Sequence, residues 1–393
     1  MSRPADRDNE QDDRPVILPG GKVDAEAVRD AIERGDGDDD GFQRVSFTLS
    51  RDLNKRLDKY LTDRIPFLSR TALQRVISEE GVTVNGRMPK ASTRLRLGDV
   101  VEVLIPPPPS KEIVGEDIPI EVLYEDERIL VLNKQPDIIV HPARSHNKGT
   151  LLNALVWYFE HSSTMGGSLS NVGKDFARPG VVHRLDRHTT GVMVIAKDEE
   201  AHWRLGRQFE RRTVNKRYLA VVHGEVDRDA DVIDFPIGPS PSKAKGMREK
   251  MVIRHDELGK NAVTICRVRE RYEGYTLVEL ELKTGRTHQI RVHMSHLGFP
   301  IVGDDMYGGR IVKASHLDPG GSDDDTVIGR QALHACVLGF RDPVSHEPLE
   351  FTAPVAMDML RLIRTLRAHK GTGWGVEVAG ATIDLPTAVP ERP

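Results

Sequence analysis

The sequence has few of the features that mark membrane, secreted or disulfide-linked proteins. It contains no apolar run approaching the roughly 20 residues that span a bilayer. Its first residues, MSRPADRDNE, lack the apolar segment of a signal peptide. Only two cysteines, Cys266 and Cys336, occur in 393 residues, and neither belongs to a C-x-x-C pair. Neither a disulfide framework nor a thiolate zinc site is indicated, and we expect a cytoplasmic protein without membrane contacts.

Several common cofactor motifs are also missing. The chain has no P-loop, no G-x-G-x-x-G after a strand and no G-x-S-x-G. His288, His293 and His296 raise the alternative of a metal-dependent hydrolase. On a helix, however, His288 and His293 would point about 140° apart at 3.6 residues per turn. Only His293 and His296 could share a helix face, and no third ligand stands at a zinc spacing from them. We therefore predict that the protein uses neither a metal nor a cofactor.

Charge is distributed unevenly along the chain. The formal net charge is -4, but residues 1–40 hold 13 Asp and Glu against 6 Lys and Arg, a local charge of -7. The remainder is therefore about +3, which is compatible with nucleic-acid binding without requiring it. Residues 1–45 also lack hydrophobic periodicity, so we expect them to form a disordered acidic tail. A length of 393 residues allows two or three domains.

Residues 46–106 have the pattern of a small basic domain. Leu53, Leu57, Tyr60 and Leu61 follow helical spacing, and Ser69 is a candidate N-cap for a second helix that would end at Gly81. Asn85-Gly86 is a strong hairpin-turn signal before a final strand at 99–105. Residues 51–100 carry a charge of +5, from 11 basic and 6 acidic side chains. The basic candidates for phosphate contacts are Lys55, Arg56, Lys59, Arg70 and Arg75.

Pro106–Pro109 is a stiff spacer at which we place the domain boundary. The larger domain would span residues 110–370, and residues 371–393 would be a C-terminal tail. Apolar strands alternate here with helices predicted at 151–159, 199–211, 288–297 and 357–366, and strands are expected on both sides of the turn at 135–137. Residues 312–328 are rich in Gly and Asp and are expected to be a disordered insertion.

The stretch Pro179–Lys197 reads PGVVHRLDRHTTGVMVIAK. It predicts a strand, a polar loop and a second strand, with Gly191 at the turn. Loops between strands often carry catalytic side chains, and Asp186 lies here among basic residues. A surface ion-pair network is the alternative explanation of the short HRLD pattern.

The complete string closely resembles the HRLD-x-x-T-[ST]-G signature of the RluA-type pseudouridine synthases, which convert uridine to pseudouridine in RNA. A second long match, KTGRTHQIRVHMSHLGFPIVGDDMYGG, covers residues 283–309. Residues 129–143 resemble the family's strand–turn–strand, although Asp137 replaces its turn glycine. RLDKYL followed by SRTALQRVISEEGVTVNG is similar to the S4 RNA-binding domain. The resemblance covers roughly residues 46–367.

The resemblance implies an α+β fold, with an S4 domain followed by a catalytic domain on a long, mainly antiparallel mixed sheet flanked by helices. It assigns Asp186 as the essential carboxylate, acting as nucleophile or as base, and Arg291 as its cation. Arg286 is the less favoured candidate for the cation that pairs with Asp186. Tyr218, in KRYLA, would stack on the target base. Arg184 would enter the space that a flipped uridine leaves.

The implied partner is RNA, most directly large-subunit ribosomal RNA, and we expect a monomer. Modification of tRNA remains open, as does a non-catalytic RNA-binding role in ribosome assembly. The presence of Asp186, Tyr218 and Arg291 together argues against the non-catalytic role.

Overall fold

The computed structural model describes residues 15–34, 42–105, 113–141, 148–170, 179–241, 250–371 and 375–391. The chain divides into two compact units, one that ends at Pro108 and a larger one that continues from Pro109. The expected spacer, Pro106–Pro109, lies outside the described residues. No helix in the described ranges is both long enough and apolar enough to cross a membrane.

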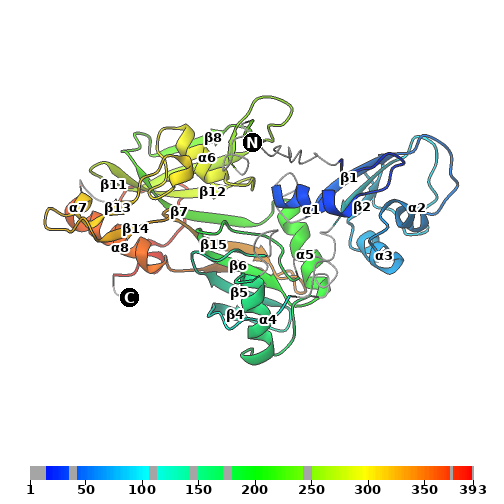
Figure 1. Ribbon diagram of the computed structural model, residues 1–393, viewed down its shortest axis with the longest axis horizontal. Coiled ribbons are helices and arrows are strands. Elements are labelled where there is room, and N and C mark those ends of the chain that lie inside the picture. Colours follow the sequence, from blue (N-terminus) through cyan, green and yellow to red (C-terminus); the bar gives the residue numbers. More distant parts are fainter. Residues whose placement is uncertain are drawn as a thin grey trace, which may run out of the picture. The chain divides into compact units, whose positions relative to one another are not determined.

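The N-terminal unit is a three-stranded antiparallel sheet with helices (blue in Figure 1). The sheet order is β1-β3-β2. The elements are α1 Ala25–Arg34, β1 Gln43–Thr48, α2 Leu57–Arg64, α3 Arg70–Ser78, β2 Val82–Val84 and β3 Val100–Ile105. The Ser69 side chain caps α3 by accepting from Ala72 N at 3.1 Å. Asn85 and Gly86 both have positive φ, 51° and 73°, as the predicted hairpin turn requires.

Part of the expected disordered tail is folded, so that prediction is wrong for residues 15–34. These residues include α1, whose Ala27, Val28, Ala31 and Ile32 are buried. Val23 N also donates to Arg64 O at 2.7 Å, which ties the segment to the end of α2. The four apolar residues form one helical stripe, a pattern that the acidic composition around it conceals. Residues 1–14 and 35–41 lie outside the described part.

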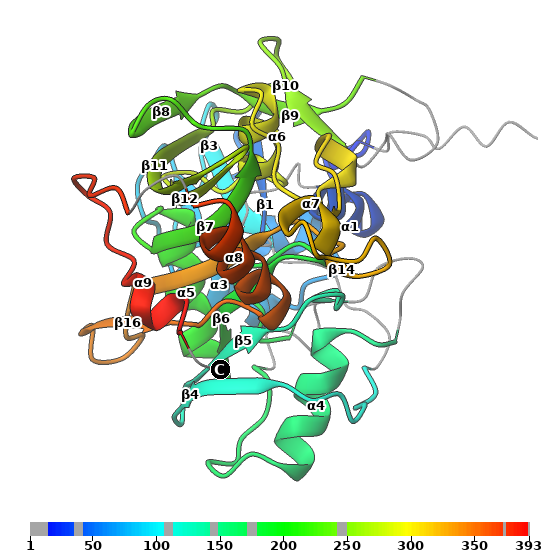
Figure 2. The same ribbon diagram turned by 90° about the vertical axis from the view of Figure 1, so that its left-hand side faces the viewer.

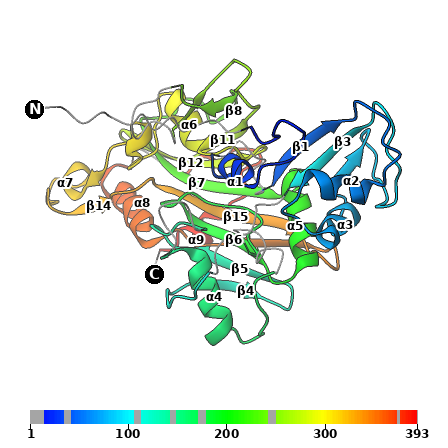
Figure 3. The ribbon, with the colours of Figure 1, turned by 45° about the vertical axis from the view of Figure 1, so that its right-hand side comes forward.

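The larger unit is built on a nine-stranded sheet that is antiparallel except where β15 meets β6, which confirms the expected mixed sheet. The order is β4-β5-β6-β15-β7-β12-β11-β8, with β16 also paired to β15, and Figure 3 shows the succession from β4 to β12. The strands are β4 Glu121–Glu125, β5 Ile129–Lys134, β6 Thr190–Ala196, β7 Asn215–His223, β8 Ala230–Asp234, β11 Val263–Tyr272, β12 Tyr275–Leu282, β15 Leu333–Arg341 and β16 Pro348–Thr352. Two small two-stranded antiparallel sheets are separate from it, β9 Ile237–Pro239 with β10 Met251–Ile253, and β13 Val312–Lys313 with β14 Thr326–Ile328.

Helices cover both faces of this sheet. They are α4 Leu151–His161, α5 Glu199–Glu210, α6 Gln289–His296, α7 Ala314–Leu317, α8 Met357–His369 and α9 Leu385–Ala388, with the 3₁₀ turn η2 Asp305–Tyr307. In β6, Val192 and Val194 join the core beneath α5, whereas Met193 and Ile195 join the core beneath α4. Because side chains alternate along a strand, α4 and α5 lie on opposite faces of β6. Figure 2 shows α4 beside β4 and β5.

Gly191 has a different role from the expected one. It lies inside β6 with φ of 121°, while the turn is made by Arg187 and His188. A Cβ on Gly191 would lie 2.1 Å from Ala335 O, so only glycine permits the parallel contact of β6 with β15. The expected strands at 181–182 and after the 135–137 turn are also too long. Each is a single bridge, Val181 with Ile195 and Ile139 with Thr150.

The segments expected as an insertion and a tail are both packed. Leu317, Val327 and Ile328 of the 312–328 region share one apolar core with Leu360 and Ile363 of α8. The prediction of a disordered insertion is therefore wrong. Its few apolar residues are spread among Gly and Asp, and their burial depends on the later helix α8.

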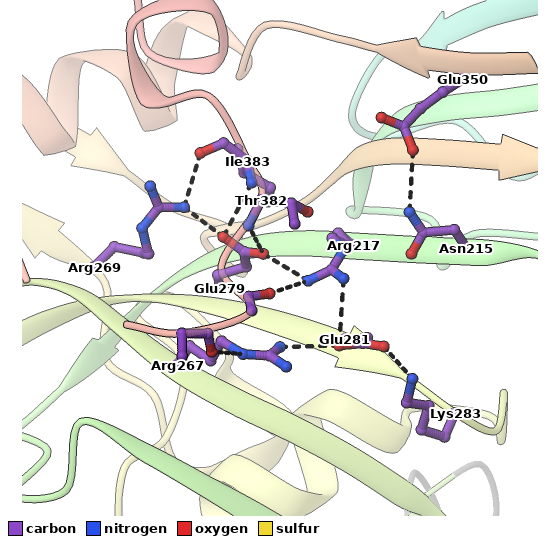
Figure 4. Close-up of polar contacts among 12 residues, drawn as sticks. Asn215, Arg217, Arg267, Arg269, Glu279, Glu281, Lys283, Glu350, Thr382 and Ile383 are labelled. Atoms are coloured by element: carbon purple, nitrogen blue, oxygen red, sulfur yellow. Dashed lines mark hydrogen bonds and ion pairs between the residues drawn. The ribbon is translucent and has the colours of Figure 1, made fainter. Parts of the chain in front are cut away.

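The described C-terminal residues, 375–391, are held to the sheet by hydrogen bonds between their backbone and side chains of the sheet (Figure 4). Glu279 of β12 accepts from Thr382 N at 3.0 Å and from Ile383 N at 3.3 Å. Arg217 Nη1 donates to Gly380 O at 2.9 Å. Ile383 and Val389 are buried in the large core. The prediction of a C-terminal tail is therefore wrong for these residues. Their backbone groups are hydrogen-bonded by side chains that lie more than a hundred positions earlier in the chain.

Candidate active site

A pocket on the larger unit collects residues from six parts of the chain. Its lining comes from the loop 183–189, the end of α5, β7, the end of β12, the start of α6 with its preceding loop, and the start of β15. The apolar part of the lining consists of Leu185, Phe209, Leu282, Ile290 and Leu333. All four residues singled out for the larger domain, Arg184, Asp186, Tyr218 and Arg291, line this pocket. An apolar pocket with a few converging polar groups is the usual form of a small-ligand site.

Asp186 and Arg291 form an ion pair at its centre. Arg291 Nη1 donates to Asp186 Oδ2 at 3.0 Å, and the side chains are 7% and 21% exposed for Arg291 and Asp186 respectively. The alternative cation, Arg286, also lines the pocket, but its Nε donates to Asn261 O at 3.2 Å. The structure therefore favours Arg291 over Arg286 as the partner of Asp186.

Electrostatics keep Asp186 ionised. Burial alone would raise the pKa of Asp186, but nearby charges and the Arg291 hydrogen bond lower it to about 2. His288 contributes to that shift while it is protonated, and its Nε2 lies 3.8 Å from Asp186 Oδ2. Because burial lowers the pKa of His288 to about 4, this ring is neutral at pH 7. Arg291 and Arg184 are then the cations that stabilise the carboxylate.

Asp304 fixes Arg291 from the other side and is not among the residues predicted from the sequence. Arg291 Nε and Nη2 donate to the two carboxylate oxygens of Asp304 at 2.7 and 2.9 Å, and Asp304 is fully buried. Such a bidentate pair fixes the guanidinium plane. Tyr307 adds its ring, whose centre lies 4.8 Å from Arg291 Cζ. Both residues belong to the 283–309 motif, so their position in GDDMYGG was the available signal.

The loop that carries Asp186 is anchored through its backbone. Buried Lys134 donates to Arg187 O at 3.0 Å, to Ile138 O at 3.1 Å and to Gln135 O at 2.8 Å. Arg330 Nη1 donates to His188 O at 2.9 Å and is itself held by Asp358. Lys134 and Arg330 thus restrain consecutive carbonyls directly after Asp186. Neither was singled out from the sequence, because carbonyl acceptors leave no pattern in it.

The turn next to this loop adopts the geometry that its missing glycine would supply. Asp137 has φ of 64°, a left-handed conformation that Asp adopts more readily than most residues. Its side chain pairs with His188 Nδ1 at 2.5 Å. The substitution of Asp for glycine therefore preserves the turn and adds a link to the loop of Asp186.

Two of the three histidines considered as metal ligands, His288 and His293, have hydrogen-bond partners elsewhere. His293 Nδ1 lies 2.9 Å from Thr264 Oγ1, and its Nε2 lies 3.0 Å from Phe235 O. His288 Nδ1 lies 2.8 Å from Tyr307 Oη. Within the described ranges, no group of three or more His, Cys, Asp or Glu is placed to hold a metal ion.

The basic surface of the N-terminal unit is organised by a buried carboxylate. Asp58 is fully buried and accepts from Arg56 at 3.1 Å, from Arg70 at 2.8 Å and from Gln74 at 3.0 Å. Hydrogen bonding, with Arg56 foremost, holds the pKa of Asp58 well below its usual range. The Arg56 and Arg70 side chains nevertheless remain 44% and 49% exposed. Among the other candidates, Lys59 is exposed, Arg75 is partly buried and Lys55 pairs with Asp63.

Comparison with known proteins identifies both units. The family model described as RNA pseudouridylate synthase matches residues 128–296, and that of the S4 domain matches residues 55–101. An uncharacterized RNA pseudouridine synthase of Bacillus subtilis is 41% identical over 329 residues, covering 84% of this chain and 100% of that protein. Ribosomal large subunit pseudouridine synthase D of Escherichia coli K12 is 37% identical over 335 residues, covering 83% and 96%. The corresponding Vibrio vulnificus protein is 39% identical over 320 residues, covering 80% and 92%.

Proposed function

The chain belongs to the RNA pseudouridine synthase family, and on that basis we propose that it isomerises specific uridines of large-subunit ribosomal RNA with Asp186 as the essential group. The observation that carries the proposal is the ionised Asp186, held by Arg291 in a pocket with apolar walls. The family is established by a relative 41% identical over 84% of this chain. The choice of large-subunit RNA follows the names of the Escherichia coli and Vibrio relatives.

The proposed reaction moves the uracil from its N1 to its C5 attachment. Asp186 attacks the nucleoside or accepts a sugar proton while the bond between C1′ and N1 breaks. The detached base turns in the pocket, C5 bonds to C1′, and the C5 hydrogen leaves as a proton while N1 gains one. Uridine and pseudouridine are isomers, so this sequence consumes no redox equivalent. The role of Arg291 is to keep Asp186 anionic within a partly desolvated site.

A direct assay tests the function. Purified full-length protein is incubated with unmodified transcripts of large-subunit rRNA, small-subunit rRNA and a tRNA pool, and pseudouridine is quantified by nucleoside mass spectrometry. We expect pseudouridine in the large-subunit transcript. If pseudouridine formed only in tRNA, tRNA would replace large-subunit rRNA as the proposed substrate. RNA binding without any pseudouridine would favour a non-catalytic assembly factor. We also propose that the protein acts in the cytoplasm as a monomer.

Tyr218 is proposed to stack on the target base. It lines the pocket from β7 and packs against two apolar cores. Tyr218→Phe keeps the aromatic face, so RNA affinity should persist. Tyr218→Leu keeps apolar bulk but removes the ring, which should cost about 1–3 kcal/mol of stacking on one base. Filter binding with both variants and the wild-type protein checks the expectation. An affinity of Tyr218→Leu equal to that of the wild-type protein would exclude stacking by Tyr218.

Arg70 is proposed to contact an RNA phosphate from the N-terminal unit. Arg70→Met should weaken binding to all RNA sequences alike and reduce the slope of log affinity against log salt by about 0.7–0.9. Asp58 would keep Arg56 and Gln74 as partners, so the unit should remain folded. Arg361→Met, on α8 and paired with Asp325, is the matched control. An unchanged salt slope for Arg70→Met would remove Arg70 from the RNA-binding surface.

A further inference from the structure

Lys216 is a pocket residue in the KRYLA segment, and neither the resemblance nor the proposed reaction gives it a role. It lies on β7 two residues before Tyr218, and both side chains line the pocket. Side chains at i and i+2 of a strand share one face and lie about 6.6–6.8 Å apart along it. Lys216 is therefore held at a fixed offset from the ring proposed to stack on the uracil.

The neighbours of Lys216 on β7 are engaged elsewhere. Asn215 Nδ2 donates to Glu350 at 3.1 Å, and Arg217 Nη1 donates to Glu279 at 2.9 Å (Figure 4). Arg217 also lies 3.5 Å from a Glu281 oxygen. Carboxylates thus neutralise Arg217 on the opposite face of the strand. For the Lys216 side chain, by contrast, the described residues offer no hydrogen-bond or ion-pair partner, and only its backbone is paired, with β15.

The charge balance of the pocket leaves Lys216 available for an anion. Asp186 is the acidic residue in the lining, and Arg291 already occupies one of its oxygens at 3.0 Å. The lining also contains Arg184, Arg286 and the neutral His183, whose pKa burial lowers to about 3 with the Lys216 charge contributing. A half-buried ammonium without a carboxylate partner beside a cationic rim attracts a polyanion. RNA entering this pocket brings one phosphate per nucleotide.

We propose that Lys216 binds a backbone phosphate adjacent to the uridine that occupies the pocket, an assignment that rests on the function proposed above. Lys216 fixes the position of the RNA backbone while Tyr218 stacks on the base. It is a substrate-positioning residue and takes no part in bond making or breaking. Its contact is with phosphate, so it contributes affinity at any RNA sequence that reaches the pocket.

Phosphate-ethylation interference tests the assignment. The probe is a transcript fragment of large-subunit rRNA that contains a uridine converted by the wild-type protein. Ethylation neutralises single phosphates, and bound and unbound RNA are separated and mapped. With wild-type protein we expect interference at a phosphate next to the converted uridine. With Lys216→Met, which keeps the length of the apolar stem, interference at that phosphate should disappear while the other positions remain.

Two further readouts belong to the same experiment. Lys216→Met should reduce the salt slope by about 0.7–0.9 and leave the single-turnover rate at saturating RNA unchanged. Lys370→Met is the matched control, because Lys370 lies at the end of α8 and pairs with Glu273 at 3.5 Å. It should retain the wild-type interference pattern and salt slope.

The outcomes separate this assignment from the function on which it rests. Interference that persists unchanged in Lys216→Met would overturn the phosphate contact. A fall in the saturated rate as large as the fall in affinity would also overturn it, in favour of a role at the reacting base. Failure of the wild-type protein to convert any uridine would instead refute the proposed function.

Discussion

Asp186→Asn is expected to lower the turnover rate by several orders of magnitude while leaving the affinity for RNA nearly unchanged. Asparagine is almost isosteric with aspartate, and its oxygen can still accept from Arg291 Nη1. Arg291 also keeps both of its bonds to Asp304, at 2.7 and 2.9 Å, so the pocket should retain its shape. The amide is neutral and is a poor nucleophile and base, so neither proposed route is open to it.

The measurement is tritium release from C5 of uridine-labelled large-subunit rRNA under single-turnover conditions, with affinity measured separately by filter binding. Asp305→Asn is the matched control, since Asp305 is an exposed neighbour of Asp304 in the same segment and should retain wild-type activity. If Asp186→Asn kept activity within about tenfold, a loss of only ~1.4 kcal/mol, Asp186 would be a structural ion-pair residue.

Arg291→Gln should produce the second large effect, on both pH dependence and stability. An adjacent opposite charge lowers a carboxylate pKa by about 1–3 units, and burial acts in the other direction at Asp186. Without Arg291 the pKa of Asp186 should rise from about 2. Because the ionised form is the active one, activity would then be lost at a higher pH as the solution is acidified. The acid limb of kcat/KM should move upward by about 1–3 pH units.

The stability effect arises at Asp304. Arg291→Gln leaves Asp304 as a buried carboxylate without its cation, which should cost about 3–5 kcal/mol in the free energy of unfolding. The double variant Arg291→Gln/Asp304→Asn removes that unpaired charge and should recover most of the loss. It should still show the shifted acid limb. An unshifted acid limb in the double variant would mean that another group holds Asp186 ionised.

Local sequence signals predicted much of the fold. Ser69 caps its helix and Asn85-Gly86 forms its turn, because each depends on nearby backbone groups alone. The helices α4 and α5 begin at the predicted residues, Leu151 and Glu199. The mixed sheet, by contrast, was predicted from the family resemblance, because hydrophobic periodicity indicates where strands lie but not the order in which they pair.

The errors at Gly191 and in the C-terminal segment share a physical cause, which is dependence on distant partners. Gly191 was interpreted as a turn residue, but its requirement arises from Ala335 on a strand more than a hundred residues later. The C-terminal segment was expected to be loose because its fixation depends on Glu279 and Arg217. In the site, Asp186 and Arg291 were recognisable from their motifs. Asp304 lies inside the second motif, but its part was not predicted because it acts through Arg291. Lys134 was not predicted because it acts through backbone carbonyls.

Pseudouridine mapping in a complemented deletion strain tests the central claim most directly. Large-subunit rRNA is compared from cells without this gene, from cells given back the wild-type gene, and from cells given the Asp186→Asn gene at equal protein level. We predict that specific pseudouridines disappear on deletion, return with the wild-type protein and stay absent with Asp186→Asn. A deletion that removes no large-subunit pseudouridine, or lost pseudouridines that return with Asp186→Asn, would contradict the account.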